Sequence, residues 1–234
     1  MRYYGQKNSV LSGEWSDGNS SEERSESMGK RQPSPKRFTP DASHVTACVF
    51  RTPWGWMGVS ETTKGIDAVV LPKFSRQAVL TELGFPSAEL LAGETSPRLR
   101  EAQAQLTDYL AGTRRSFDLS LDLSRGTSFQ RKVWQTLRRV SYGQLRSYQW
   151  VAARVGGRQY ARAVGNAVGA NPMPIVIPCH RIVAQDASLG GFSGGLPTKR
   201  KLLTLEGTLA ELRSGRSQPA LLMSNSAAIA NPLR

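Results

Sequence analysis

The pattern of apolar and polar residues divides the 234-residue chain into a patterned middle and two unpatterned ends. Residues 1–42 and 209–234 are rich in small, polar or charged residues and contain little periodic apolar sequence, which is typical of disorder. We therefore expect a disordered tail at residues 1–42, a folded part at residues 43–208 and a flexible tail at residues 209–234. The KRQPSPKR cluster in the first tail fits a nuclear-import signal or an ordinary basic patch, and so short a match does not separate the two.

The first part of the folded region has the pattern of a small sheet with a helix. Three β-rich runs, HVTACVF, WGWMGVSET and GIDAVVLP, are separated by turn-forming residues and predict a meandering antiparallel sheet. FDLSLDLS alternates apolar and polar residues and predicts a final strand over residues 117–124. Between these runs, apolar residues recur at helical spacing before Gly112 and predict a helix: Leu99, Ala102, Leu106, Tyr109 and Leu110.

A longer amphipathic helix opens the second part of the folded region. Thr127 or Ser128 can cap its start, and Gly143 marks its predicted end. The apolar residues that share one face of this predicted helix are Phe129, Val133, Leu137 and Val140.

Two shorter helices are predicted next, around a glycine turn. Ser147 can cap the helix YQWVAARV, GG forms the turn, and RQYARAVGNAVGAN predicts a further helix, which together give the helix-turn-helix signature. Many helical hairpins never touch DNA, but the outward face of the last helix carries Arg158 and Arg162 among small residues, so something must approach it closely. Its predicted inward residues are Ala161, Val164 and Val168, and its small or short outward ones are Ala163, Gly165, Asn166, Ala167 and Gly169.

Basic residues are concentrated after residue 124. Residues 1–124 contain 15 basic and 15 acidic side chains, whereas residues 125–216 contain 15 basic and 3 acidic ones. A solvated surface normally mixes both signs, so this excess favours a phosphate-binding surface. The charge alone does not show which nucleic acid the surface binds.

The bulk composition predicts a soluble protein that stays inside the cell. No apolar run approaches the roughly 18 residues that a membrane span needs, and no signal peptide is recognisable. Two cysteines, Cys48 and Cys179, are too few for a disulfide framework or a Cys-rich zinc site. We expect at least one free thiol, no structural zinc and no membrane partner.

The sequence IVIPCHRIV places Cys179 directly beside His180, in a chain with only two residues of each type. A lone cysteine in an apolar run is usually buried and inert. Here a proline-rich lead-in can hold the thiol in place, and Glu206 is one of the few acidic residues able to orient the imidazole. Cationic surroundings then predict a lowered pKa for Cys179, with His180 as the proton acceptor.

Three stretches carry a family resemblance: GTSFQRKVWQTLRRVSYGQLRSY, ARAVGNAVGANPMPIVIPCHRIV and GGFSGGLPTKRKLLTLEG. They resemble the catalytic domain of the methylated-DNA protein-cysteine methyltransferases, also called O6-alkylguanine-DNA alkyltransferases. The resemblance covers residues 126–207 and extends less closely back to about residue 44. Its most specific element is PCHR with the upstream ARAVG and NP.

The resemblance implies both a reaction and a way of reaching DNA. Cys179 would take the alkyl group in one irreversible transfer, His180 would deprotonate it through a water, and Asn171 and Glu206 would complete the hydrogen-bonded chain. A base inside a duplex is unreachable until it is flipped out. Arg162 is similar to the finger that enters the duplex there, and Tyr148 to the tyrosine that contacts the nearby phosphate and the guanine ring. The last predicted helix would lie in the minor groove, with Arg158, Ala161 and Gly165 also at the DNA.

The other residues that the resemblance places at the flipped base are Pro174, Ile182, Phe192, Ser193 and Lys199. Phe192 departs from the tyrosine that is common in the family, so it keeps a stacking face and lacks a hydroxyl. Family members that bind zinc use Cys and His residues in the first domain, where this chain has only Cys48 and His44. We therefore expect no metal and no cofactor.

These observations predict an α/β (α+β) protein with a small mixed sheet domain at residues 43–124 and a helical domain at residues 125–208 that carries the helix-turn-helix. The predicted function is repair of O6-alkylguanine, mainly O6-methylguanine, with O4-methylthymine as a further candidate. The predicted partner is alkylated double-stranded DNA, and we expect a monomer that works in the nucleus of a eukaryote or the cytoplasm of a bacterium. The alternatives are a non-catalytic alkyltransferase-like protein, against which the presence of Cys179 counts, and a Cys-His hydrolase, for which no oxyanion site is evident.

Overall fold

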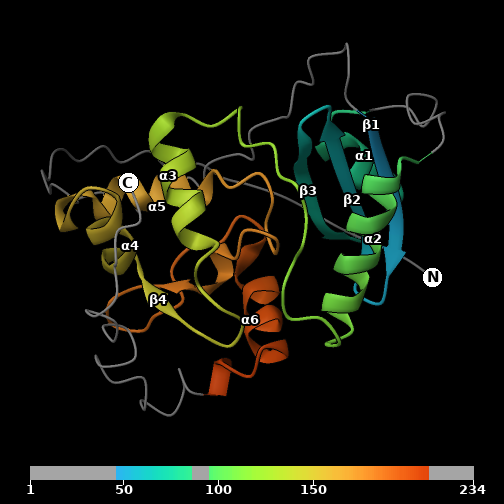
Figure 1. Ribbon diagram of the computed structural model, residues 1–234. Coiled ribbons are helices and arrows are strands. Elements are labelled where there is room, and N and C mark those ends of the chain that lie inside the picture. Colours follow the sequence, from blue (N-terminus) through green and yellow to red (C-terminus); the bar gives the residue numbers. More distant parts are fainter. Residues whose placement is uncertain (1–45, 86–94, 211–234) are drawn as a thin grey trace, which may run out of the picture. The chain divides into compact units, whose positions relative to one another are not determined.

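A three-stranded antiparallel meander forms the first part of the fold (Figure 1). The structure is a computed structural model in which residues 46–85 and 95–210 are described. Strands β1 (Thr46–Thr52), β2 (Gly55–Thr62) and β3 (Gly65–Lys73) lie in the order β1-β2-β3. The predicted meander is therefore confirmed. The predicted tail at residues 1–42 lies outside the described residues, as does the tail after residue 210.

Helices cover both faces of this sheet. Helix α1 (Arg76–Leu83) packs on the face that includes Ala68 and Val70, whereas α2 (Pro97–Leu110) joins the cluster that includes Val69 and Leu71. This division follows from the alternation of side chains along β3. Helix α2 confirms the predicted helix, whereas α1 was not predicted.

The predicted strand over residues 117–124 is wrong. The segment makes one isolated bridge, in which Leu121 pairs with Ile66 of β3 in parallel. The Ile66 N–H donates to the Ser120 carbonyl, and the Asp122 N–H donates to the Ile66 carbonyl. Alternating apolar residues make a strand only where a partner strand runs alongside, and here the contact lasts for one residue.

Helix α3 (Ser128–Leu137) begins as predicted and ends earlier. Thr127 is the N-cap and forms a capping box with Gln130, in which each side chain accepts a hydrogen bond from the other residue's backbone N–H. The helix was expected to reach Gly143, but the chain turns after Leu137. Val140 is buried beyond the helix end, so its apolar character reflects the core and not the helix.

The predicted helix-turn-helix is present. Helix α4 (Tyr148–Val155) has Ser147 as its N-cap, and a 3₁₀ turn, η2 (Arg158–Tyr160), leads into α5 (Ala161–Gly169). Gly157 has φ 135, a backbone conformation that glycine adopts far more readily than other residues. The remaining elements are the paired strands β4 (Arg146–Ser147) and β5 (Ile182–Val183), the 3₁₀ turn η3 (Cys179–Arg181) and helix α6 (Gly195–Leu205).

One hydrophobic cluster includes residues from the sheet, from α2 to α6 and from the segment that leads to Cys179. The backbone joins these parts as well, because the Val69 N–H donates to the Pro172 carbonyl at 2.9 Å. The sheet face that α2 covers is therefore continuous with the packing around the candidate site. Among the described residues, none of the helices has the length and apolar character to span a membrane.

Candidate functional site

Cys179 lies at the end of a tightly held loop. The side-chain amide of Asn171 donates to the Ile177 carbonyl at 2.8 Å and to the Cys179 sulfur at 3.1 Å, and its oxygen accepts the Met173 N–H at 3.0 Å. One side chain thus ties the start of the loop to its end. The Cys179 side chain is almost completely buried, with 2% of the residue exposed.

The loop also contains an unusual backbone conformation. Ile175 has φ 77, where a β-branched side chain is crowded by its own backbone. Such a conformation costs about 1–3 kcal/mol and persists only where the surroundings hold it in place. Here the Ile175 side chain is buried and the Asn171 hydrogen bonds fix the chain on both sides. The position of Cys179 is therefore strongly constrained.

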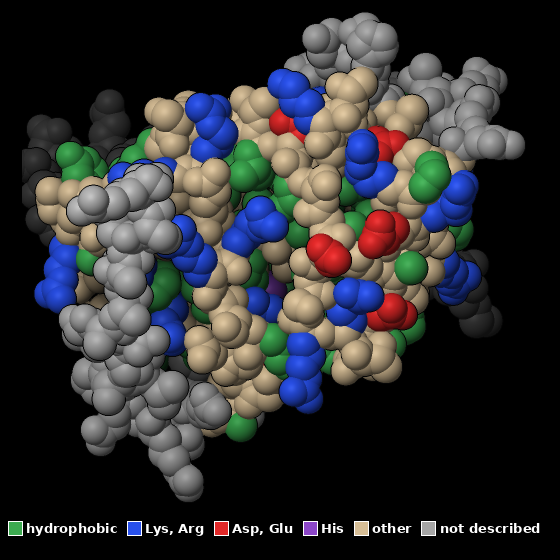
Figure 2. All heavy atoms as spheres, viewed as in Figure 1, with side chains coloured by type: hydrophobic (Ala, Val, Ile, Leu, Met, Phe, Trp, Pro, Cys, Tyr) green, Lys and Arg blue, Asp and Glu red, His purple; other side chains and the backbone are tan. Residues whose placement is uncertain are grey.

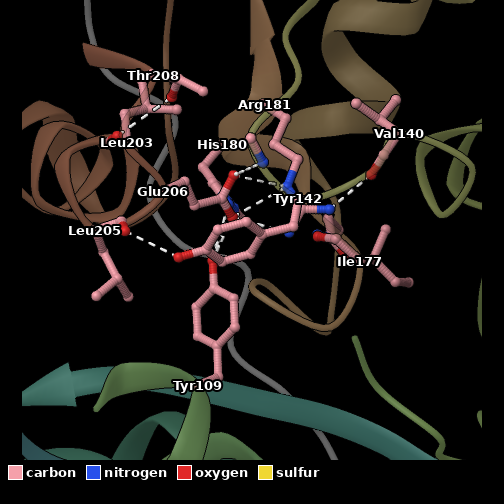
Figure 3. Close-up of polar contacts among 12 residues, drawn as sticks. Tyr109, Val140, Tyr142, Ile177, His180, Arg181, Leu203, Leu205, Glu206 and Thr208 are labelled. Carbon is pink, nitrogen blue, oxygen red and sulfur yellow. Dashed lines mark hydrogen bonds and ion pairs between the residues drawn. The ribbon is translucent and has the colours of Figure 1, made fainter. Parts of the chain in front are cut away.

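His180 and Glu206 form a buried pair beside this loop (Figure 3). His180 Nε2 lies 2.9 Å from Glu206 Oε1. Glu206 is the residue at which α6 ends, and its carboxylate also accepts hydrogen bonds from the Arg181 guanidinium at 2.8–3.1 Å and from the Gly143 N–H at 3.2 Å. Tyr109 of α2 donates its hydroxyl to the same carboxylate.

These contacts fix the charge states of the pair. Burial alone would raise the pKa of Glu206, but hydrogen bonds from His180 and Arg181 and the Arg181 charge lower it to about 2. Burial lowers the pKa of His180, although Glu206 opposes this effect. Glu206 is therefore a carboxylate and His180 a neutral imidazole at neutral pH.

The hydrogen bond to Glu206 also selects the tautomer of His180. A carboxylate accepts hydrogen bonds only, so Nε2 carries the hydrogen and Nδ1 is the acceptor. Nδ1 is buried and has no hydrogen-bond partner among the described residues. A neutral imidazole with its free nitrogen held in this way is suited to accept a proton from a neighbouring group.

The expected lowering of the Cys179 pKa is wrong for the protein alone. Burial raises the pKa of this thiol, and the hydrogen bond from Asn171 and the charge of Lys199 only partly oppose it. The sequence argument considered the basic surroundings and left out desolvation, which is the larger effect at this depth. Cys179 is therefore a thiol at neutral pH and needs a base to remove its proton.

Lys199 lies next to this site without reaching solvent. Its ammonium donates to the carbonyl of Ile182, at 2.5 Å, and to the carbonyl of Leu189. Burial lowers the pKa of Lys199 to about 8. The lysine thus ties α6 to β5 and to the loop that follows, and it places a positive charge near Cys179.

The loop over residues 190–194 lies against Tyr148, the first residue of α4. A Cβ atom on Gly190 would lie 3.1 Å from Tyr148 Cε2, so another residue here would need Tyr148 to shift by a few tenths of an ångström, and at φ 62 its own backbone would be strained. Burial raises the pKa of Tyr148, and the proximity of Cys179 adds to the shift. The other predicted base contacts differ in exposure: Pro174 is buried, Phe192 is half-buried and Ser193 is exposed.

The predicted DNA-reading helix, α5, presents a mixed surface. Arg158 and Arg162 are exposed, Ala161 is partly buried, and a Cβ atom on Gly165 would meet nothing within 4 Å. Ala167 was expected on the outward face, and this is wrong. It is buried, and its carbonyl accepts a hydrogen bond from the Trp134 indole at 2.8 Å.

Charge is unevenly distributed over the surface. On the face shown in Figure 2, acidic side chains gather on the side of the sheet and α2, where Lys and Arg are mixed with them, whereas the side of α3 and α4 shows Lys and Arg without acidic side chains. This asymmetry agrees with the excess of basic residues after residue 124. The basic side is the one that carries the helix-turn-helix.

Cys48 is buried like Cys179, but it has neither the neighbouring histidine nor the amide donor of that residue. It lies in β1, and its nearest polar partner is the Leu99 carbonyl at 4.0 Å from the sulfur. Burial, with the nearby Glu61 charge, raises its pKa to about 12. Within residues 46–85 and 95–210, both cysteines are free thiols and no group of three or more His, Cys, Asp or Glu side chains could hold a metal ion. His44 lies outside the described residues.

Sequence reasoning missed two residues of the Glu206 cluster, Arg181 and Tyr109. Arg181 directly follows the Cys-His pair, so its position was a usable signal. Tyr109 was predicted only as part of an apolar helix face, because its partner lies 97 residues away in the chain. Nothing local to Tyr109 indicates that contact.

Comparisons with known proteins agree with this architecture. A family profile described as "6-O-methylguanine DNA methyltransferase, DNA binding domain" matches residues 128–208. The chain is 49% identical over 105 residues to the methylated-DNA protein-cysteine methyltransferase of Mycolicibacterium paratuberculosis, covering 45% of this chain and 63% of that protein. It is 42% identical over 160 residues to the protein of the same name from Methanosarcina acetivorans, covering 68% of this chain and 97% of that protein.

Solved structures of O6-methylguanine methyltransferases are similar to this chain as well. The O6-methylguanine methyltransferase of Mycobacterium tuberculosis matches with a TM-score of 0.56 at 34% identity, over 69% of this chain and 92% of that one. A structure described as Mycobacterium tuberculosis OGT in complex with DNA matches with a TM-score of 0.56 at 31% identity, over 74% of this chain and 99% of that one.

The fold and the site define a mixed α/β protein with a DNA-binding domain and a buried cysteine beside a histidine and a glutamate. The stretch matched to the first relative spans less than two thirds of that protein, whereas the second relative is matched over nearly its whole length. The chain belongs to the family of methylated-DNA protein-cysteine methyltransferases.

Proposed function

We propose that this protein repairs O6-alkylguanine in double-stranded DNA by moving the alkyl group to Cys179, once per molecule. The observation that carries the proposal is the arrangement of three buried side chains in which Cys179 adjoins His180 and Glu206 holds His180 by Nε2. The transfer requires a thiol and a neutral imidazole beside it that can take the thiol proton, and burial keeps His180 neutral.

The proposed reaction is a single displacement. His180 Nδ1 takes the thiol proton through a water, and the Cys179 sulfur attacks the alkyl carbon. The S–C bond forms as the C–O6 bond breaks, and guanine leaves with the electron pair and gains one proton, which balances the proton lost by the thiol. The resulting thioether is chemically stable, so each molecule reacts once.

Asn171 and Lys199 both support this step. The Asn171 amide donates to the sulfur, and the Lys199 charge acts on the same thiol, so both favour the thiolate that forms during the transfer. Glu206 stabilises the imidazolium that His180 becomes. The flipped guanine also loses its contact with solvent at this site. Electrostatic interactions with the reacting groups are stronger where water is excluded.

Access to the alkyl carbon requires the base to leave the duplex, at a cost of a few kcal/mol. We propose that α5 lies in the minor groove and that the exposed Arg162 fills the position of the flipped base, with Arg158, Ala161 and Gly165 at the DNA backbone. The flipped base would sit between Tyr148 and the loop that carries Phe192 and Ser193, bounded by Pro174 and the backbone of Ile182. Lys199 would shape the base site indirectly, by holding the Ile182 and Leu189 carbonyls in place.

The proposed substrate is mainly O6-methylguanine, with O4-methylthymine as a further candidate, and the protein is proposed to act as a monomer without a cofactor. It would act in whichever compartment holds the DNA.

Mixing the protein with O6-methylguanine duplex and measuring its intact mass tests the proposal. We expect one methyl group per molecule, no further gain with excess substrate, and loss of the methyl group from the DNA in equal amount. Binding to methylated duplex without any gain in mass would favour the alkyltransferase-like alternative. Many turnovers per molecule would exclude the single transfer.

A further inference from the structure

Tyr109 brings a hydroxyl from α2 into the buried cluster around Glu206 (Figure 3). The residue is completely buried, and its ring packs against Phe117, with centroids 5.3 Å apart, and edge-on against Tyr142, with centroids 6.0 Å apart. Its oxygen lies 2.5 Å from Glu206 Oε1 and 3.3 Å from His180 Nε2. Packing on two sides leaves the hydroxyl little freedom to point elsewhere.

The protonation of this cluster defines the direction of each hydrogen bond. Burial raises the pKa of Tyr109, and the Glu206 charge raises it further, so the phenol keeps its proton. That proton must go to Glu206, because a carboxylate offers only acceptors. The phenol oxygen then turns its lone pairs toward the Nε2 hydrogen of His180.

We propose that Tyr109 is a positioning residue for the transfer, which fixes the Glu206 carboxylate and the Nε2–H of His180 so that Nδ1 faces the proton of Cys179. The inference rests on the proposed function of Cys179 and His180. Two oxygens, one from Glu206 and one from Tyr109, surround the Nε2 hydrogen and favour a single tautomer and ring orientation.

The origin of the donors around Glu206 adds to this inference. Arg181 and Gly143 belong to the segment after residue 124, as does His180. Among the described residues that donate to Glu206, Tyr109 alone precedes residue 124. Helix α2 therefore completes a catalytic arrangement that the PCHR stretch does not contain by itself.

Other charged or titratable groups face His180 and must be considered with Tyr109. Glu206 raises the pKa of His180, whereas burial and the charges of Arg181 and Lys199 lower it. The Tyr109 hydroxyl and His180 Nε2 both donate to Glu206 Oε1. Removing the hydroxyl should leave the carboxylate less firmly held and should take away one of the two oxygens around the Nε2 hydrogen, so that this hydrogen is held more weakly.

The test compares Tyr109→Phe with Tyr142→Phe. Tyr142 lies against Tyr109, but its hydroxyl donates to the Leu205 carbonyl and not to Glu206. Each change removes one buried or half-buried hydroxyl from the same region, so a general loss of packing should affect both. We expect Tyr109→Phe to transfer the methyl group about tenfold more slowly, the loss typical of one hydrogen bond to a charged group, while Tyr142→Phe keeps the wild-type rate.

Nitrogen-15 NMR of histidine-labelled protein gives a measurement that needs neither DNA nor transfer. The chain has two histidines, so the signals of His180 can be identified with a His44→Gln variant. We expect the wild type to show the Nε2–H tautomer with a slowly exchanging proton. In Tyr109→Phe this proton should shift upfield and exchange faster, and in Tyr142→Phe it should not change.

Three results would overturn the inference: an Nδ1–H tautomer in the wild type, an unchanged His180 signal in Tyr109→Phe, or wild-type transfer by that variant. The first result remains informative if Tyr109→Phe does not fold. Failure of the proposed function is distinguishable, because it would appear as wild-type protein that gains no methyl group while the His180 signals are as expected.

Discussion

His180 Nε2 lies 2.9 Å from Glu206 Oε1, and the side chains of both residues are completely shielded from solvent. Arg181 is paired with the same carboxylate, so its charge compensates the buried anion. Breaking such a pair by removing one partner is costly, because the other is left buried without compensation. The pair that we propose for proton transfer is therefore also a determinant of stability.

This pair predicts that stability falls as the pH is lowered. The pKa of His180 is below its ordinary value of 6.5, so the unfolded chain gains a proton first and stability decreases below about pH 6.5. The pKa of Glu206 falls from 4.5 to about 2, so a second decrease runs from about pH 4.5 to 2. Urea unfolding at closely spaced pH values measures both.

The variant Glu206→Gln separates the contribution of Glu206 to the pH dependence of stability from that of His180. The carboxylate contributes about 3 kcal/mol at neutral pH, the value that its pKa shift represents. We expect the variant to lose free energy of unfolding on this scale at pH 7 and to show a smaller decrease below pH 4.5. A variant with wild-type stability at pH 7 and the same dependence on pH would contradict the assigned role of the pair.

Arg162→Ala should slow repair in duplex DNA much more than reaction with the free O6-methylguanine base. The exposed guanidinium is proposed to occupy the space that the flipped base leaves in the duplex. A free base leaves no such space, so its reaction does not need Arg162. Parallel rate measurements on the two substrates test this. Arg51→Ala, a change at an exposed arginine of β1, is the matched control and should leave both rates unchanged. Equal losses on both substrates in Arg162→Ala would show that Arg162 has a different role.

Phe192→Tyr should retain transfer within about threefold of the wild type, the range expected when a half-exposed hydroxyl is added without loss of the ring. The ring is half-buried, and the change keeps its stacking surface. The measurement is the rate of methyl transfer at several duplex concentrations. A loss of more than a hundredfold would mean that Phe192 does not line the base site.

Local signals predicted much of the helical part of the fold. Ser147 and Thr127 cap helices where the sequence indicated, because a cap joins residues only two or three positions apart. The same kind of signal was present for α1, where Ser75 is the N-cap and Gly84 ends the helix with φ 84. That helix was missed because its eight residues are too few to show a clear apolar period.

Features that depend on distant partners were not predictable in this way. The alternation over residues 117–124 was real, but only Leu121 finds a strand beside it. The spacing placed Tyr109 correctly in the core, whereas the contact of its hydroxyl with Glu206 depends on packing between α2 and α6. The pKa of Cys179 was predicted in the wrong direction because burial, unlike charge, cannot be counted along a sequence.

The most direct test of the central claim is peptide mapping of the protein after reaction with duplex that carries labelled O6-methylguanine. The account predicts the label on Cys179, none on Cys48, undiminished transfer by Cys48→Ser, and none by Cys179→Ser, which should still fold and bind methylated duplex. Cys48 is the internal control, because burial and the Glu61 charge raise its pKa to about 12 and no base lies within hydrogen-bonding distance of it among the described residues. Label on Cys48, or full transfer by Cys179→Ser, would contradict the account.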